Sequence, residues 1–416
     1  MKNPLTQSLI STASLLAFAS VVAAQNAQPT EQSGSSLSDV LRNARYEFGR
    51  GLTFTSADGD SSATVGGQIQ ASYNWTEANF GFDANGAPVL APNDFSANSA
   101  FDVGARLRVG GSVWDGQVEY LLQMSPNGGE QGAGNDGNLV DAWVNWGLAD
   151  GISIRLGTQK MRSGLSADTS ANDTDFETIG RSFATDEFAN SRATGALIQG
   201  AAMSDRFNWH VGVANNGTAR NATSSLLGLN AGANQGNDDT DMMVTAGASF
   251  GSHAGNSESW SEGDLARAGE MQWIVGATFT ADNGDVAGVN DDSETINAFF
   301  GMKMGNGLAA QLEYWTRDNE QAIDTTDDGA YAQLSYTMAK SGSMQPGVVV
   351  RYSTATWEQG PGLNDVELDG YLVGVNAYFA GHDLKTQLSY STGSASGLFA
   401  TDAEQTSVDL MMTVVF

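Results

Sequence analysis

Alternation of apolar and polar residues is the feature that most constrains this chain, and it continues from Gly51 to the last residue. Such a period of two is typical of β-strands, because successive side chains of a strand point to opposite sides. The alternating segments lie near 62–77, 99–112, 113–124, 138–148, 151–159, 193–203, 206–215, 241–250, 270–282, 292–304, 308–318, 329–339, 345–358, 368–380, 383–393 and 404–416. The pattern therefore predicts an all-β fold of about sixteen strands, each near the nine to eleven residues that a tilted membrane strand needs.

Charged side chains keep to one face of these segments. In 99–112, for example, Leu107 lies on the apolar parity, whereas Asp102, Arg106 and Arg108 lie on the other. A Lys or Arg facing the middle of a lipid bilayer costs about 2–4 kcal/mol, so the apolar parity suits lipid and the polar parity suits a water-filled lumen. A water-soluble sandwich with its polar face outside shows the same alternation, and the pattern alone leaves both folds open.

The connections between the segments alternate in length. Short turns are expected at Gly110–Gly111, Ala149–Gly151, Ser204–Asp205, Gly305–Gly307 and Gly381–His382. Long polar loops are expected at 78–98, 125–137, 160–192, 216–240, 283–291, 319–328 and 394–403. Transmembrane antiparallel β-barrels have short periplasmic turns and long outer loops in this order. Residues 251–269 break the rule, because a short turn is expected there; either this turn carries an insertion or the strands are miscounted.

The last segment also favours a barrel. Aromatic residues such as Trp146 and Phe416 lie near segment ends on the apolar parity, as in the girdles of outer-membrane barrels. A barrel must pair its last strand with its first, because an open sheet edge is not tolerated in lipid. A final strand that is regular up to Phe416 is what such closure requires.

The N-terminal region has the features of an export signal. Lys2 precedes an apolar stretch over Leu9–Val22, and small residues lead up to Ala24, which predicts a signal peptide cleaved after Ala24; an uncleaved anchor is the alternative. Residues 38–45 could form a short helix. The predicted division of the chain is 1–24 for the signal peptide, 25–50 for a flexible N-terminal segment and 51–416 for the barrel.

Composition excludes several classes of function. The chain carries 19 Lys and Arg against 48 Asp and Glu, a formal net charge of -29, whereas nucleic-acid binding needs a basic surface. His210 stands on the polar parity of its segment without a partner motif, and we expect it to line the lumen rather than act as a catalytic base. Acidic runs such as Asp327–Asp328 lack the regular spacing of a calcium loop and are interpreted as solvated loop tips. No enzyme activity, metal or cofactor is therefore expected.

Three stretches resemble a known family. Residues 51–75, 105–123 and 139–164 are similar to the first hairpins of the phosphate-selective porin O and P family. The resemblance implies a sixteen-stranded, homotrimeric outer-membrane channel of a Gram-negative bacterium, constricted by inward-folded loops, with lumenal Arg and Lys that pass anions such as phosphate. One departure is that Met161-Arg162-Ser163-Gly164 stands where the family tends to have Pro-Phe-Gly.

The candidate selectivity residues are the charges expected in the lumen. Those on strands are Arg106, Arg108, Arg155, Asp102, Glu119 and Asp141, and those of the loop 160–192 are Lys160, Arg162, Arg181 and Arg192. The basic residues could form a ladder that draws anions through a pore, or they could be structural partners of the lumenal acids. The loop 160–192 could fold inward as a constriction or lie at the surface in solvent.

The sequence thus favours an outer-membrane porin, a water-filled barrel embedded in lipid that passes small hydrophilic solutes or ions by diffusion. Two alternatives remain open at this stage. One is an outer-membrane barrel with an enzymatic or adhesive role, and the other is an acidic, secreted all-β surface protein.

Overall fold

The computed structural model describes residues 43–82, 88–90, 96–126, 139–169, 174–189, 192–215, 223–224, 229–230, 242–252, 256–283, 285–286, 289–290, 292–320, 324–360, 364–397 and 402–416. Sixteen of the described strands form one closed antiparallel barrel. They are β3 (Ser62–Ala78), β6 (Ser96–Val113), β7 (Val118–Met124), β8 (Leu139–Ala149), β9 (Ile152–Lys160), β10 (Arg192–Ala202), β11 (Phe207–Asn215), β14 (Met242–Gly251), β15 (Gln272–Asn283), β18 (Asp292–Lys303), β19 (Leu308–Glu320), β20 (Thr325–Thr337), β21 (Gln345–Trp357), β22 (Val366–Tyr378), β23 (Leu384–Ser396) and β24 (Ala403–Val415).

The barrel closes where its last strand meets its first. Strand β24 pairs antiparallel with β3, for example Leu410 with Tyr73. The ladder continues to the end of the chain, because the backbone N–H and C=O of Phe416 both hydrogen-bond to Gly67, at 2.8 and 2.7 Å. Each alternating segment of the sequence corresponds to one of the sixteen strands, and the closure expected from the terminal strand is confirmed.

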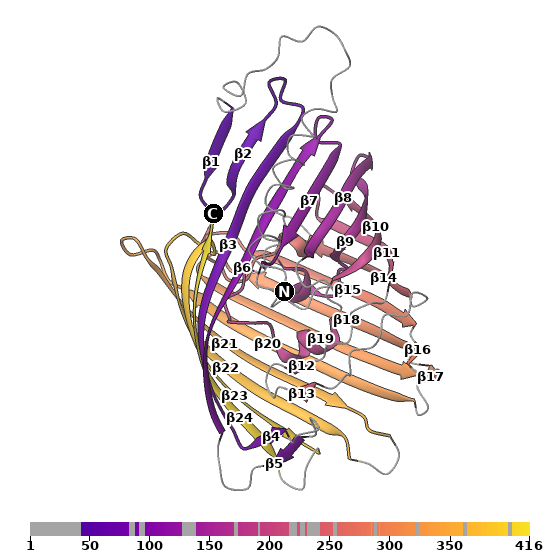
Figure 1. Ribbon diagram of the computed structural model, residues 1–416, viewed down its shortest axis with the longest axis vertical. Helices are drawn as coiled ribbons and strands as arrows, with labels where there is room; N and C mark the ends of the chain where they lie inside the picture. Colours follow the sequence, from indigo (N-terminus) through magenta and orange to yellow (C-terminus); the bar gives the residue numbers. More distant parts are fainter. Residues whose placement is uncertain are drawn as a thin grey trace, which may run out of the picture.

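Two smaller features flank the barrel. Strands β1 (Ala44–Glu47) and β2 (Gly51–Thr55) form a hairpin, and β2 pairs with the start of β3 beyond the point where β24 ends. Figure 1 shows this hairpin beside the C-terminus. The expected helix over 38–45 is wrong for Ala44 and Arg45, whose backbone groups pair with β2 instead, and residues 25–42 lie outside the described part of the chain.

The connections at one end of the barrel, here called the turn end, are short as expected, with one correction. The glycines Gly110–Gly111 do not form a turn but lie within β6, where a Cβ on Gly111 would be 2.0 Å from the carbonyl oxygen of Ser62. They allow close approach of neighbouring strands. The turn follows at Trp114–Gln117, closed by a bond of 3.0 Å from the Gln117 N–H to the Trp114 carbonyl.

The long connection after β14 is an insertion and not an error in counting. Strands β14 and β15 pair in register up to Gly251 and Ile274, so they are neighbours joined at the turn end. The residues between them, 252–271, are here called the turn insertion. Residues 252 and 256–271 of it are described, and they include the 3₁₀ helix η1 (Ser257–Ser259).

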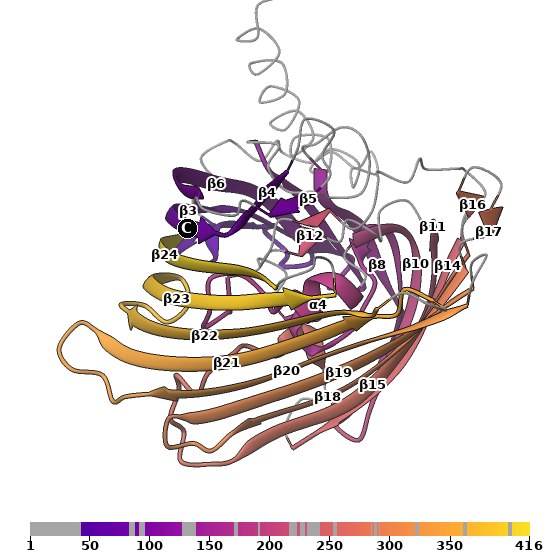
Figure 2. The same cartoon turned by 90° about the horizontal axis from the view of Figure 1, so that it is seen from below.

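The long connections lie at the opposite, loop end, but the long loop expected at 319–328 is wrong, because β19 and β20 extend through most of it and leave only residues 321–324 between them. Three of them contain a described two-stranded hairpin each, β4 (Phe80–Phe82) with β5 (Pro88–Leu90), β12 (Thr223–Ser224) with β13 (Leu229–Asn230), and β16 (Asp285–Val286) with β17 (Val289–Asn290). The connection from β9 to β10 differs from these. It contains two short helices, α3 (Leu165–Asp168) and α4 (Phe183–Phe188), and Figure 2 shows α4 inside the ring of strands.

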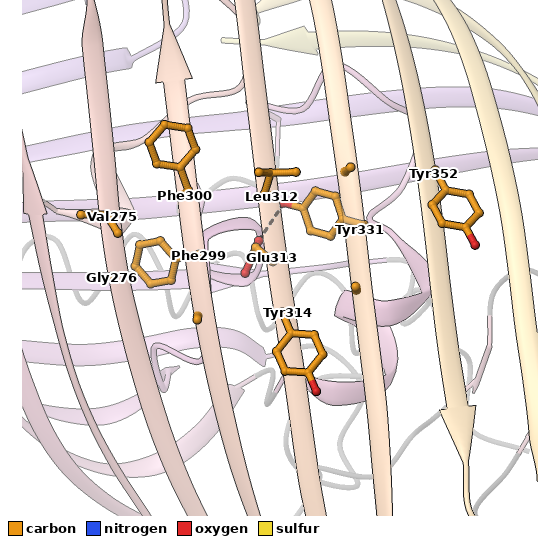
Figure 3. Close-up of a pocket in the computed structure, with 12 residues that line it drawn as sticks. Val275, Gly276, Phe299, Phe300, Leu312, Glu313, Tyr314, Tyr331 and Tyr352 are labelled. Carbon is orange, nitrogen blue, oxygen red and sulfur yellow. Dashed lines mark hydrogen bonds between the residues drawn. The ribbon is translucent and has the colours of Figure 1, made fainter.

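The outer face of the barrel is apolar. On β19, Leu312 and Tyr314 are 49% and 48% exposed, whereas their neighbours Glu313 and Trp315 are 2% and 0% exposed and face the lumen. Figure 3 views this part of the wall, where the outward side chains border an apolar groove over β15 and β18–β21. An apolar outside and a polar inside fit a lipid-embedded barrel and exclude a soluble sandwich with its polar face in water. Among the described residues, none of the helices is long and apolar enough to cross a membrane.

Candidate functional site: the lumen and its two inward segments

The connection 160–192, here called the constriction loop, folds into the lumen. Phe183 and Phe188 of α4 are 5% and 3% exposed and pack against Trp315 and Tyr331 on the inner wall of β19 and β20. The rings of Phe188 and Trp315 stack with centroids 6.5 Å apart. Gly329 makes this approach possible, because a Cβ there would lie 2.3 Å from the Phe188 ring. Of the two positions that the sequence left open for this loop, the inward one is what the structure shows for its described residues.

Polar contacts fix the start of the loop to the same wall. The carboxylate of Glu313 accepts hydrogen bonds from the backbone N–H groups of Leu165 at 2.9 Å and Ser166 at 2.6 Å. The Tyr331 hydroxyl donates to the same carboxylate at 2.7 Å, the bond drawn in Figure 3. A carboxylate that receives three donors inside the barrel holds α3 in one place.

A buried ion-pair network holds the other helix. Arg317 of β19 pairs with Glu187 of α4 at 2.9 Å and with Asp327 of β20 at 2.8 Å. The Trp357 indole N–H donates to Glu187 at 3.0 Å. Asp327 is 4% exposed, so the interpretation of Asp327–Asp328 as a solvated loop tip is wrong for Asp327, which faces the lumen and is bound by Arg317.

The turn insertion enters the lumen from the other end and meets the constriction loop. The Glu262 carboxylate accepts from the backbone N–H of Glu177 at 2.8 Å and from the Gln333 side chain at 2.9 Å. Trp260 lies in one apolar cluster with Leu165 of α3. The lumen is therefore crossed by two segments that touch each other, one from each end of the barrel.

The two segments also meet at a basic cluster. Arg155 on β9 and Arg162 in the constriction loop both bind Glu258 of the turn insertion, at 2.7 and 2.6 Å. The Arg155 guanidinium lies 4.3 Å above the Trp143 ring, a cation–π contact. Lys160 is 8% exposed beside them, and its Nζ donates to the Thr169 carbonyl at 3.1 Å.

A second group of predicted residues lies on the neighbouring strands β6 to β10. Arg192 pairs with Asp141 at 3.0 Å. Gln123 lies between Asp141 and Arg106. Its amide nitrogen donates to the Asp141 carboxylate at 3.3 Å, and its amide oxygen accepts from the Arg106 guanidinium at 3.3 Å. Glu119 accepts from Asn145 at 3.1 Å. The predicted acids Asp141 and Glu119 are thus among the partners of lumenal polar groups.

The remaining predicted residues lie apart from both groups. Arg108 is only partly buried, and its guanidinium donates to the Arg50 carbonyl at 3.3 Å near the turn end. Arg181 donates to the Ser166 carbonyl at 3.2 Å within the constriction loop. Asp102 is exposed, and its carboxylate accepts from the backbone N–H of Val103. Arg108, Arg181 and Asp102 therefore stand apart from the other candidate selectivity residues, and the role of the ladder in selectivity remains a prediction.

Reasoning from the sequence missed the acids that hold the inward segments, chiefly Glu258, Glu262 and Glu313. The unexpected length of the turn insertion was the only signal for the first two. Glu313 lies on the polar parity of its strand, but alternation places many residues there and does not say which of them a loop will reach.

Burial and neighbouring charges change the pKa of three carboxyl groups in the two inward segments. Burial, with the nearby Glu262 carboxylate, raises the pKa of Glu177 from 4.5 to about 8. Burial also raises the pKa of Asp168, to about 6, although Arg162 opposes this. Burial acts in the same direction on Glu258, but Arg162 and Arg155 outweigh it and hold the pKa of Glu258 below its usual range. Within the described part of the chain, no cluster of three or more His, Asp or Glu side chains could hold a metal ion.

Solved structures with a similar fold include outer-membrane porins and other outer-membrane proteins. The anion-selective porin from Comamonas acidovorans has a TM-score of 0.53 at 14% identity, covering 86% of this chain and 100% of its own. The channel DcaP of Acinetobacter baumannii has a TM-score of 0.53 at 10% identity, covering 87% and 99%. OmpT of Vibrio cholerae has a TM-score of 0.52 at 10% identity, covering 85% and 98%. Identities this low show a shared fold only.

The sequence itself identifies the family. No curated protein sequence matches the chain. The family described as "Phosphate-selective porin O and P" matches residues 75–416, which include every strand of the barrel except the first part of β3. The chain therefore belongs to this family, and it is a porin of the Gram-negative outer membrane that forms a water-filled channel for passive diffusion of small hydrophilic solutes and ions.

Proposed function

We propose that the channel passes small anions in weak preference to cations, and that the selectivity is set where the constriction loop meets strands β8 to β10. The observation that carries this proposal is that Arg155 and Arg162 converge on Glu258 beside Lys160. Each of the three basic residues is less than 9% exposed. Membership of the phosphate-selective porin O and P family and the similar fold of the anion-selective porin from Comamonas acidovorans support an anion preference.

The total charge of the protein acts in the opposite direction, but from a greater distance. The formal charge of -29 attracts cations to the outer loops. Charges separated from the ion path by more than a Debye length, about 8 Å at physiological salt, are largely screened, whereas charges at a constriction are close to every permeating ion. The preference is weak because Glu258 and Asp141 already neutralise part of the basic charge.

Reversal potentials in a KCl gradient test this proposal. Wild-type channels in planar bilayers should favour chloride at high ionic strength and shift toward potassium as the salt concentration falls and the field of the loops reaches further. The double variant Arg155→Gln with Arg162→Gln should lose the chloride preference. Arg206→Gln, which removes one exposed charge at the turn end, is the control. A strong cation preference that does not change with salt would refute the proposal.

Three further statements complete the proposed function. We infer that the protein performs no chemistry, which is supported by its membership of a family of channels. Residues 1–24 act as a signal peptide and are removed on export, which leaves a short N-terminal segment, 25–50, before the part of the chain, 51–416, that contains the barrel strands β3 to β24. Three copies assemble into a homotrimer, as the family resemblance implies. N-terminal sequencing of the mature protein and its mass in detergent test the last two statements.

A further inference from the structure

One carboxylate occupies the centre of the basic cluster, and it comes from the opposite end of the barrel. Glu258 binds Arg155 through two hydrogen bonds, of 2.7 and 3.3 Å, and binds Arg162 through a third, of 2.6 Å. The side chains of the two arginines are 10% and 5% exposed, whereas that of Glu258 is 24% exposed. The carboxylate is thus the more open partner and sits where an anion in the lumen would meet the guanidinium groups.

The turn insertion holds Glu258 in this position. Asn256 caps the 3₁₀ helix η1, because its side-chain oxygen accepts from the Glu258 N–H at 3.0 Å. The same oxygen lies 3.4 Å from an Arg162 guanidinium nitrogen. Ser257 donates to Asp168 of the constriction loop at 2.7 Å. Three consecutive residues of the insertion therefore contact the cluster, and Glu258 is not a mobile surface charge.

We propose that Glu258 is a specificity-determining residue of the channel: a built-in counter-ion that competes with permeating anions for Arg155 and Arg162. This rests on the proposed anion preference, which it extends by naming the group that limits it. Two arginines and one carboxylate leave a net charge of +1 at this point of the lumen. Without the carboxylate the same point would carry +2, beside the neighbouring Lys160, Asp141 and Asp168.

The geometry supports competition rather than simple pairing. Guanidinium groups bind carboxylate oxygens in a planar arrangement with two parallel hydrogen bonds, which Arg155 and Glu258 show. The second arginine shares one of the two carboxylate oxygens, so both oxygens of Glu258 are bound to the guanidinium groups that an incoming anion would approach. Arg162 also donates to the Gln199 side chain at 2.7 Å. Because Gln199 carries no charge, it does not neutralise Arg162, and the positive charge of Arg162 would attract an anion if Glu258 were replaced by a neutral residue.

The test replaces Glu258 by the isosteric, uncharged Gln. In planar bilayers with a KCl gradient, Glu258→Gln should raise the chloride-to-potassium permeability ratio at least about fivefold, because one unit charge a few ångströms away acts about fivefold on each ion in water and in opposite directions on the two ions. Glu270→Gln removes the same charge from an exposed position of the same insertion and should leave the ratio unchanged. Glu258→Gln combined with Arg162→Gln should return the ratio close to the wild-type value, because both changes act at one point.

The outcomes separate this inference from the proposed function. If Arg155→Gln with Arg162→Gln lowers the ratio but Glu258→Gln leaves it unmoved, the arginines select anions and the role of Glu258 is refuted. If neither variant changes the ratio, both proposals fail. Heat-modifiable migration in gels shows whether each variant folds. If Glu258→Gln does not fold, Glu258→Asp, whose side chain is too short to reach both arginines, must still raise the ratio by a smaller factor, and an unchanged ratio would refute the role.

Discussion

The two sides of the lumen hold the constriction loop by different interactions. On the side of β19 to β21, α4 is held by aromatic packing of Phe183 and Phe188 on Trp315 and Tyr331, and by a carboxylate network around Arg317. On the side of β8 to β10, the loop presents Arg162 to Arg155 and Glu258. We call the first side the anchored wall and the second side, which carries the basic cluster proposed to set selectivity, the charged wall.

The largest expected effect comes from breaking the anchored side at its ion-pair network. Arg317→Gln leaves Glu187 and Asp327, 3% and 6% exposed in their side chains, without a cation. Loss of one partner of a buried network costs about 3–5 kcal/mol, so the variant should unfold at clearly lower temperature or denaturant concentration, measured by heat-modifiable migration. Arg50→Gln breaks the exposed pair with Glu47 and should change stability by less than about 1 kcal/mol. Equal effects of the two changes would contradict the assignment of the anchor.

A smaller effect is expected from pushing α4 off the wall. In Gly329→Ala the new methyl group would meet the Phe188 ring at 2.3 Å, whereas in Gly147→Ala it would lie 3.5 Å from its nearest neighbour. Overpacking of this kind costs about 1–3 kcal/mol, which should displace α4 and change single-channel conductance for Gly329→Ala only. If both variants keep the wild-type conductance, the aromatic packing is not what positions the loop.

The contact between the loop and the turn insertion should depend on pH. The pKa of Glu177 is raised to about 8 by burial and by Glu262. When the loop contacts the turn insertion, the Glu177 carboxyl therefore keeps a proton that it would lose above about pH 4.5 in a free loop. The stabilisation by this proton is therefore complete below about pH 4.5 and is lost progressively as the pH rises to about 8. Current noise in single-channel recordings should increase between about pH 4.5 and pH 8 in the wild type. Glu177→Gln should be insensitive to pH over that range; a variant as sensitive as the wild type would show that another group titrates.

The smallest effect on selectivity is expected at Asp102, a charge outside both the anchored wall and the charged wall. Asp102 is exposed, and its carboxylate accepts from the N–H of the next residue, Val103, rather than from a lumenal cation. Asp102→Asn should therefore shift the reversal potential far less than Glu258→Gln, although each removes one negative charge. Equal shifts would mean that total lumenal charge, and not the charged wall, controls selectivity.

The strands were predictable because alternation is a local property. Each strand buries or exposes its side chains by parity, so the neighbours Leu312 and Glu313 are enough to distinguish the two faces of the wall. The turn at Trp114–Gln117 was missed because Gly110–Gly111 has the composition of a turn, whereas these glycines serve close strand approach inside β6. Turn chemistry and close packing both favour glycine, and the sequence alone does not distinguish them.

The sequence by itself determined the barrel, the faces of its strands and the family, because these depend on local periodicity and on motifs within single hairpins. Only the tertiary structure decided which charges meet. Glu258 lies 103 positions from Arg155 in the chain and 96 from Arg162, and no local pattern relates them. They are brought together because the barrel closes through Phe416 and Gly67. Closure places segments from the two ends of the barrel in one enclosed lumen. An unpaired charge buried there costs several kcal/mol, so the opposite charges pair.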